Sequence, residues 1–262
     1  MTAIPILLYH SVGDSAAAAN RPWYVSVSAF KEQLLLIKRH GFTCLTISAL
    51  VDAIDHNTLP EKPLAITFDD GADDFAENAA ALLARYDMPA TMYVPSAYVG
   101  RFMPWSHNDL NVGRQIMGWD VLSGFDPTLV ELGAHSATHP QLDVVSRAKS
   151  RKEIIDSKAQ MEKGLGRSIR SFAYPHGYHS AAVRRMVREA GFDSASACGN
   201  RWSHADEDRF ALSRLTVFGD LTLAEFESAL TSPPHRKPAP RHAPRLGWRC
   251  VRRVQQRFVG VP

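Results

Sequence analysis

Two adjacent carboxylates follow a short apolar run. The segment Leu64-Ala-Ile-Thr-Phe-Asp-Asp-Gly ends in Asp69 and Asp70, and Gly71 permits a sharp turn directly after them. Neighbouring like charges disfavour joint ionisation unless a cation lies close to them. The pair is therefore either a helix-opening turn, where aspartate is favoured, or one side of a metal site.

Two histidines follow a second apolar run, residues 130–133. His135 and His139 stand at the spacing i, i+4, which places both imidazoles on one side of a helical turn or a tight loop, where they can bind one ion. Pro140 favours the loop, because it would interrupt a helix. The alternative is one buried, hydrogen-bonded histidine and one histidine on the surface.

A third segment, residues 171–177, combines Pro175 with Gly177 at the end of another apolar run. Turns of this kind can present peptide N–H groups to a developing oxyanion, although an ordinary strand-to-helix turn has the same composition. One aspartate with two histidines would leave a coordination position open for water or substrate, as catalytic zinc requires. The other aspartate is then suited to be the general base.

Short apolar runs alternate with helical patterns along most of the chain. Helices are expected from Ser28 to Gly41, from Asp73 and Asp74 through Leu83, and over residues 146–164. This alternation predicts an α/β fold with a mostly parallel sheet, either barrel or open, whose ligands bind at the carboxyl ends of the strands. The expected strands are residues 4–9, 43–45, 64–68, 90–94, 130–133, 171–174, 194–197 and 211–217.

The bulk composition is that of a soluble globular protein with one large domain. The chain has 262 residues, 45% of them hydrophobic and 22% charged. Three widely separated cysteines predict neither a disulfide framework nor a cysteine metal site, and they favour a reducing compartment. We expect no signal peptide and no transmembrane segment, because the apolar run at residues 4–9 is too short, and hence a cytoplasmic location.

The charge is unevenly distributed. Residues 228–262 contain eight Lys and Arg and no acid, which gives this segment a charge of +8. Because the net charge of the chain is +3, residues 1–227 carry −5. The Pro-rich stretch at residues 231–240 divides a catalytic domain, 1–230, from a basic tail, 231–262. This tail is a solvated extension or a peripheral anchor to an anionic membrane surface, with Trp248 and Phe258 entering the interface. No nucleic-acid partner is expected, because residues 1–227 are acidic and contain no recognisable nucleic-acid-binding module.

Three motifs together resemble a known family. Thr67-Phe-Asp-Asp-Gly71, His135-Ser-Ala-Thr-His139 and Phe172-Ala-Tyr-Pro-His-Gly177 resemble, in order, the first three motifs of the polysaccharide deacetylase family, also called the NodB homology domain. The resemblance covers roughly residues 4–230. It implies a distorted (β/α) barrel with about seven strands and metal-dependent hydrolysis of an N-acetyl or O-acetyl group on a sugar.

The resemblance also assigns roles. It implies that Asp69 is the general base, that Asp70, His135 and His139 hold one divalent metal ion, and that the backbone around Tyr174 stabilises the oxyanion. Zn²⁺ is the first choice of metal, while Co, Ni, Fe and Mn are also compatible with these ligands.

Two departures from the family pattern point to other residues. Ala173 stands where the family usually has an arginine that orients the base, as in a branch with the FAYPxG form that includes biofilm-polysaccharide deacetylases. Arg214 is a candidate substitute, although a strand-end arginine more often forms an ordinary ion pair. The family's late Leu-x-His motif is absent from residues 200–230. The segment at residues 6–10, which ends in His10, resembles this Leu-x-His motif, as in family members whose motif order is circularly shifted.

His10 is the expected general acid, because imidazole titrates near neutrality, and its alternative role is that of a hydrogen-bonded core histidine. The turn Pro175, His176 and Gly177 and the indole of Trp202 are the expected substrate contacts. Trp105, Trp119 and Tyr178 are further candidates for lining a sugar groove, although aromatic residues more often pack in a core.

Three functions remain open at this stage. The first is a metal-dependent deacetylase of an amino-sugar-containing glycan or glycan precursor. The second is a deacylase of a lipid-linked or nucleotide-linked sugar, or of a non-sugar amide. The third is a non-catalytic glycan-binding barrel. A glycosidase is disfavoured, because its two carboxyl groups must flank the scissile bond ~5–9.5 Å apart, which adjacent residues meet poorly.

Overall fold

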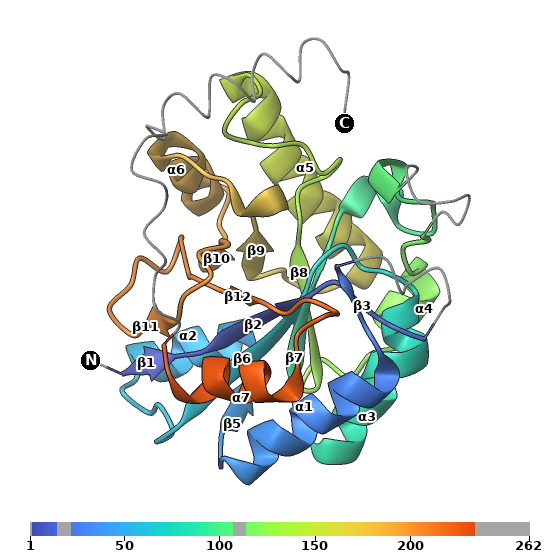
Figure 1. The fold of residues 1–262 in the computed structure, drawn as a ribbon. Helices are drawn as coiled ribbons and strands as arrows, with labels where there is room; N and C mark the ends of the chain where they lie inside the picture. The colour runs from blue at the N-terminus through green and yellow to red at the C-terminus, as the bar shows by residue number, and fades with distance from the viewer. Residues whose placement is uncertain (1, 15–21, 107–113, 234–262) are drawn as a thin grey trace, which may run out of the picture.

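The computed structural model describes residues 2–14, 22–106 and 114–233, and its centre is a curled parallel sheet (Figure 1). Seven strands follow one another by hydrogen bonding in the order β10-β9-β8-β7-β6-β2-β12, and β5 pairs with β6 beside this path. The bounds are β2 (Ile6–Tyr9), β5 (Thr43–Leu45), β6 (Pro63–Phe68), β7 (Ala90–Val94), β8 (Val130–Ala134), β9 (Ser171–Ala173), β10 (Ser194–Ser196) and β12 (Leu215–Thr216).

The two ends of this path approach each other. Residues 211–214 run beside β10, where the peptide N–H of Ala197 donates to the carbonyl of Leu212, and they lead directly into β12. The sheet is therefore the distorted barrel expected from the motifs, and the open sheet is excluded. Two small pairs lie outside it: β1 (Ala3–Ile4) with β11 (Ser203–His204), and β3 (Ser11–Val12) with β4 (Tyr24–Val25).

Helices cover the outside of the sheet. In Figure 1, α5 and α6 lie side by side at the top, whereas α1, α3 and α7 lie together at the bottom. A π-helical turn, η2 (Phe75–Ala79), precedes α3, and short 3₁₀ turns are η3 (Ser96–Tyr98), η4 (Pro104–Ser106) and η5 (Pro175–Gly177). The α-helices are α1 (Val27–Arg39), α2 (Ile47–Asp55), α3 (Ala80–Tyr86), α4 (Trp119–Ser123), α5 (Arg147–Leu165), α6 (Ala181–Glu189) and α7 (Leu223–Thr231).

Two of the expected helix starts differ from the structure. The cap of α1 is Ser26, whose hydroxyl accepts from the peptide N–H of Ala29, and Ser28 lies inside the helix. The helix expected after Asp73 and Asp74 begins as the π-helical turn η2. The third start is confirmed, because Ser146 caps α5 by accepting from Lys149.

Alternation along the strands decides which side chains enter the barrel. On β8, Glu131 and Gly133 face inward, and His135 continues this side beyond the strand end. Gly133 is required here, because a Cβ at this position would lie 2.5 Å from the ring of Tyr93. The inward side of β8 thus runs from a carboxylate at one end of the barrel to a metal-ligand candidate at the other.

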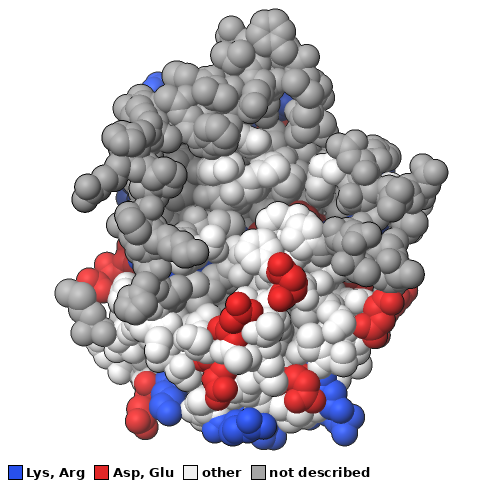
Figure 2. All heavy atoms as spheres, in the orientation of Figure 1, with Lys and Arg blue, Asp and Glu red and all other residues white. Residues whose placement is uncertain are grey.

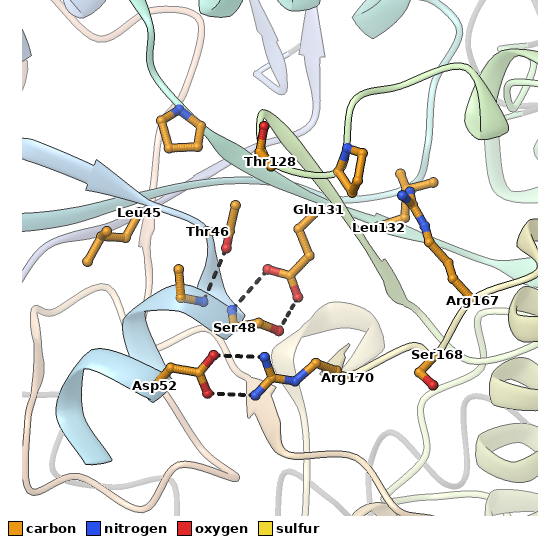
Figure 3. Close-up of a pocket in the computed structure, with 13 residues that line it drawn as sticks. Leu45, Thr46, Ser48, Asp52, Thr128, Glu131, Leu132, Arg167, Ser168 and Arg170 are labelled. Atoms are coloured by element: carbon orange, nitrogen blue, oxygen red, sulfur yellow. Dashed lines mark hydrogen bonds and ion pairs between the residues drawn. The ribbon is translucent and has the colours of Figure 1, made fainter. Parts of the chain in front are cut away.

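The base of the barrel is held by Glu131 (Figure 3). Its carboxylate accepts from the peptide N–H of Ser48 at 2.9 Å and from its hydroxyl at 2.6 Å, at the first turn of α2. It also accepts from the hydroxyls of Thr91 on β7 and Ser171 on β9. One carboxylate therefore ties α2 to three strands, and a cavity of about 520 Å³ opens beside it.

The described surface carries both charge signs. Figure 2 shows Asp and Glu spread over the face that bears α1 and α7, with Lys and Arg along its lower edge, as fits the mild negative charge of residues 1–227. Within the described ranges, no helix has the length and apolarity to cross a membrane. Most of the expected basic tail, residues 234–262, lies outside the described residues.

The hydrogen bonds of Glu131 predict a measurable loss of stability when this residue is replaced. Glu131→Ala leaves the Ser48 peptide N–H and three hydroxyl donors without their acceptor, so the free energy of unfolding should fall by about 3 kcal/mol. Urea unfolding followed by circular dichroism measures this. Glu189→Ala is the control, because it removes only exposed ion pairs and should change stability by less than ~0.5 kcal/mol. Equal effects of the two substitutions would contradict the prediction.

Candidate metal and catalytic site

The first site element is the turn that follows β6. Asp69 and Asp70 are both buried, and Asp70 has a positive φ of 74°, followed by Gly71 at 71°. A positive φ is uncommon for residues other than glycine, although aspartate adopts it more readily than most. This turn separates the two carboxylates, so that Asp69 reaches Arg214 while Asp70 reaches the histidines.

Asp70, His135 and His139 form the ligand set expected for a metal. One ligand atom from each residue lies within 4.8 Å of the others, and all three residues are buried. His139 Nε2 is 3.3 Å from Asp70 Oδ1, and His135 Nε2 is 3.8 Å from the same oxygen. Asp70 Oδ1 is buried without a hydrogen-bond partner in the described part of the chain, as fits an oxygen whose partner would be a cation.

A hydrogen bond to a backbone carbonyl assigns the tautomer of His135. His135 Nδ1 lies 2.8 Å from the carbonyl of Ala173 and donates to it, which leaves Nε2 free to bind an ion. The loop to His139 contains two further positive φ values, 60° at Ser136 and 60° at His139. Pro140 ends this segment, so the histidines sit on a tight loop, which the sequence had left open between loop and helical turn.

Arg214 forms a fully buried bidentate ion pair with Asp69. Its Nη1 and Nη2 donate to Asp69 Oδ1 and Oδ2 at 2.7 and 2.8 Å. Its Nε donates to the carbonyl of Ala197 at 2.9 Å, which fixes the guanidinium plane. Arg214, the candidate for the arginine missing at Ala173, thus contacts Asp69 from the segment that leads into β12.

The charges of the site shift the acidities of its members. Burial, the largest single cause, would raise the pKa of the Asp69 carboxyl, but the charge and hydrogen bonds of Arg214 together with the charge of His135 outweigh it, so this pKa lies below its ordinary value. Burial likewise opposes ionisation of Asp70, and the neighbouring histidines bring its pKa well below the usual range. Burial lowers the pKa of His139 well below 6.5, which favours the neutral ring that a metal ligand requires.

His10 follows β2 and lines the same cavity as Asp69 and Asp70. Its ring packs on Trp23, with ring centroids 4.8 Å apart, and Arg114 lies 3.4 Å from its carbonyl oxygen. Burial lowers the pKa of His10, against the opposing charges of the two aspartates. Its Nδ1 is buried and has no partner among the described residues, so His10 lacks the orienting acceptor that His135 has.

These residues share one cavity of about 400 Å³, a size typical of small-molecule sites. Aromatic rings form much of its wall, and the indole of Trp105 stacks on His139 at a centroid distance of 4.2 Å. Its lining comprises Leu8, His10, Trp23, Asp69, Asp70, Trp105, Arg114, His135, His139, His176, Cys198, Asn200, Thr216 and Phe218.

Several expected contacts lie elsewhere. The indole N–H of Trp202 donates to the carbonyl of Ala229 on α7, and Trp202 is not part of the cavity lining, so its assignment as a substrate contact needs correction. Within the turn η5 only His176 reaches the cavity, while Pro175 and Gly177 are buried beneath it. These two residues shape the turn.

Tyr174 also departs from the expectation. Its hydroxyl donates to the carbonyl of Phe210 at 2.8 Å, and its peptide N–H donates to the carbonyl of Ser196 at 3.0 Å. Both donors are therefore occupied, and Tyr174 itself is not placed to stabilise an oxyanion. The physical reason is that its backbone still follows the β9 to β10 ladder, one residue before the turn.

Other residues that line the cavity were not predicted from the sequence. Phe218 lies two residues after β12, so the strand-end rule could have found it. Trp23 and Arg114 belong to no motif and follow no predicted strand, and the sequence offered no signal for them. Of the aromatic candidates, Trp105 was correctly expected, whereas Trp119 packs against Gly164 on α5.

Comparison with known proteins decides the family. A family profile described as polysaccharide deacetylase matches residues 56–195, just over half of the chain. The chain belongs to the polysaccharide deacetylase family. Its match contains Asp69, Asp70, His135 and His139, together with the turn at Pro175 to Gly177.

Individual relatives are distant but cover most of the chain. The poly-beta-1,6-N-acetyl-D-glucosamine N-deacetylase of Staphylococcus aureus (strain MRSA252) is 22% identical over 216 residues, covering 79% of this chain and 72% of the relative. The Streptococcus pyogenes deacetylase PplD matches at a TM-score of 0.76 and 22% identity, covering 88% of this chain and 99% of that one. A de-N-acetylase from Aggregatibacter actinomycetemcomitans matches at 0.75 and 20%, covering 87% and 99%. These structures show that the fold is shared.

The buried ion pair predicts a large asymmetry between single and double substitutions. Arg214→Met leaves the buried Asp69 carboxylate uncompensated, so the free energy of unfolding should fall by about 3–5 kcal/mol. The double variant Arg214→Met/Asp69→Asn should recover most of this loss, because it buries no unpaired charge. Chemical denaturation of both variants at pH 7 provides the comparison.

A surface pair is the matched control. Arg209 binds Asp55 through two nitrogens as Arg214 binds Asp69, but both partners are about two-fifths exposed. Arg209→Met should therefore cost at most ~1 kcal/mol. A double variant as unstable as Arg214→Met alone would show that the loss does not come from the unpaired charge.

Asp74 provides a pH-dependent prediction. Ser11 donates to Asp74 Oδ2 at 2.6 Å, and burial, against the opposing charge of Arg114, raises the pKa of Asp74 to about 6 from 3.8. Between these values the folded protein holds a proton that the unfolded chain has lost, so stability falls as pH rises from about 4 to 6. Asp74→Asn cannot ionise, and it should match the wild type at pH 4 and exceed it by about 1–3 kcal/mol at pH 7. Urea unfolding at both pH values tests this, and a pH-independent difference would contradict it.

Proposed function

We propose that this protein is a metal-dependent hydrolase that removes N-acetyl groups from an amino-sugar-containing glycan or glycan precursor. One observation carries the proposal. The Asp69–Arg214 ion pair and the ligand set Asp70, His135 and His139 line a single cavity of about 400 Å³. This arrangement separates two adjacent carboxylates into a candidate base and a candidate ligand.

The residues fit a divalent cation. They offer one carboxylate oxygen without a protein partner and two imidazole nitrogens, one of them oriented by a backbone acceptor. Three such ligands leave a position open, and Zn²⁺ is the first choice, with Co, Ni, Fe and Mn as alternatives. A bound ion would supply Lewis acidity, which polarises the acetyl carbonyl and makes water a stronger nucleophile.

Asp69 is positioned as the general base. Its Oδ2 lies 3.8 Å from His135 Nε2, so the carboxylate borders the space where the ligand atoms converge. Arg214 binds one lone pair of each carboxylate oxygen and leaves others available to accept a proton from water. Because Arg214 also favours the ionised carboxylate, it keeps Asp69 in the form that a base requires.

His10 is the group that we assign as general acid. It lines the cavity with Asp69 and Asp70, and a protonated imidazole can donate to a departing amine. This assignment favours an N-acetyl over an O-acetyl substrate, since an amine leaving group needs a proton more than an alcohol does. The relative from Staphylococcus aureus, named for N-deacetylation of poly-beta-1,6-N-acetyl-D-glucosamine, supports the same choice.

Two measurements on the purified protein test the proposal. Metal analysis should find one divalent ion per chain, and an acetate-release screen should find turnover of an N-acetylated amino sugar that a chelator abolishes. The screen should include β-1,6-linked and β-1,4-linked N-acetylglucosamine oligomers, a lipid-linked amino sugar and an O-acetylated sugar. Release only from the lipid-linked compound would replace the glycan with a precursor, and no release with metal bound would contradict a deacetylase.

The base assignment makes its own prediction. Asp69→Asn should lower kcat at least about 10²–10⁴-fold, because the variant cannot accept the proton of water. It should retain the metal, since Asp69 is not in the ligand set. Asp70→Asn is the contrasting variant and should lose metal and activity together. Normal turnover by Asp69→Asn would show that the base lies elsewhere.

A further inference from the structure

Helix α5 has a polar buried face. Ser150, Glu153 and Ser157 are buried at the spacing i, i+3, i+7, whereas Ile155 is 46% exposed. Buried polar side chains are costly unless they are hydrogen-bonded, so each needs a partner. Ser157 bonds within the helix to the carbonyl of Ile154, but Ser150 and Glu153 reach outside it.

Glu153 reaches the loop between the two histidine ligands. Its Oε2 accepts from the peptide N–H of Thr138 at 2.7 Å, and its Oε1 accepts from the hydroxyl of the same residue at 2.6 Å. The Glu153 residue is only 6% exposed, so this bidentate contact is shielded from water. Bonds to a carboxylate in such surroundings are short and stronger than bonds between neutral groups.

The loop needs restraint from outside. Ser136 and His139 both have a φ of 60°, in the left-handed region that side chains other than glycine rarely adopt. Within the loop, the Ser136 hydroxyl accepts from the peptide N–H of His139 at 3.0 Å. Such conformations persist when the surrounding structure over-determines them, and Thr138, directly before His139, is the point where α5 does so.

We propose that Glu153 is a positioning residue for the metal site, acting through Thr138 to hold His139 at the distance from Asp70 and His135 that one ion requires. This inference rests on the proposed function only in taking His135 and His139 as metal ligands. Glu153 binds Thr138 and is not among the described residues that line the cavity, so its contribution lies in the affinity for metal.

A second buried polar side chain of α5 supplies the comparison. Ser157 is buried like Glu153 and lies on the same face, but within the described part of the chain its hydroxyl bonds only to Ile154. Ser157→Ala therefore removes a buried polar group from α5 without touching the histidine loop. It is the matched control for a loss of helix stability that does not involve the site.

The experiment measures metal affinity without relying on activity. Metal-free wild type and the variants Glu153→Ala, Glu153→Gln, Thr138→Val and Ser157→Ala are titrated with Co²⁺ against a competing chelator, at a temperature where circular dichroism shows each to be folded. We expect Glu153→Ala to weaken Co²⁺ binding about 10–100-fold, as is usual when a second-shell partner of a ligand is removed. Its visible Co²⁺ absorption should also change, because His139 is less fixed.

The conservative variants sharpen the test. Glu153→Gln should bind Co²⁺ within a few-fold of wild type, because the amide oxygen still accepts from the Thr138 N–H and the Thr138 hydroxyl can turn to accept from the amide. Thr138→Val should fall between Glu153→Gln and Glu153→Ala, and adding it to Glu153→Ala should bring little further loss. Ser157→Ala should bind as the wild type does.

Two outcomes overturn the inference. Glu153→Ala with wild-type Co²⁺ affinity and an unchanged spectrum would show that Glu153 stabilises only the fold, and Ser157→Ala weakening binding equally would show the same. Failure of the proposed function is distinguishable, because wild type would then bind no Co²⁺ in a one-to-one ratio or would release no acetate with the metal bound. A wild type that binds metal and turns over beside a Glu153→Ala variant of equal affinity would reject the positioning role alone.

Discussion

The buried charge of Asp69 is the constraint on which the site depends. A carboxylate that is 3% exposed, with a second carboxylate beside it in the chain, is stable only next to a cation. Arg214 supplies that cation from the segment that closes the barrel path, 145 residues later. The pair therefore joins the geometry of the candidate site to barrel closure, and neither can be changed without affecting the other.

The same physical requirement recurs at both ends of the barrel. At the base of the barrel, the carboxylate of Glu131 accepts hydrogen bonds from four donors on three elements. At the mouth, the carboxylate of Glu153 accepts from the peptide N–H and the hydroxyl of Thr138. Carboxylates that are partly buried, as Glu131 is, or buried, as Glu153 is, thus act as connectors, because each can accept several hydrogen bonds at once. They fix loops and helix starts where apolar packing alone would leave the register of the polar groups undecided.

The candidate metal ligands and much of the cavity wall come from different segments of the chain. The fold is shared with deacetylase structures at 20–22% identity, and the metal-ligand candidates lie on loops at the ends of its strands. The wall of the cavity, by contrast, comes from segments that no motif marks, including Trp23, Arg114 and Phe218. The motifs therefore mark the ligand candidates but not these wall residues.

The sequence by itself indicated the parallel sheet and the candidate site, and the resemblance of its motifs to a family implied the barrel. Alternating strands and helices predicted the parallel sheet, and the spacing of Asp69, Asp70, His135 and His139 brought the ligands to one face, because the carboxyl ends of parallel strands meet there. These features are local, and period-two alternation carries them from residue to residue.

Only the tertiary structure decided the rest. The partner of Asp69, the occupied donors of Tyr174, the turn of Trp202 toward α7 and the burial of Glu153 all depend on contacts between residues far apart in the chain. From the sequence alone, a glutamate side chain is expected to be exposed to solvent. Its burial becomes favourable only when a donor from a distant part of the chain forms a hydrogen bond with it. Such pairings leave no periodic signal, and this is why the sequence indicated the ligand candidates but not the contacts of Tyr174, Trp202 and Glu153.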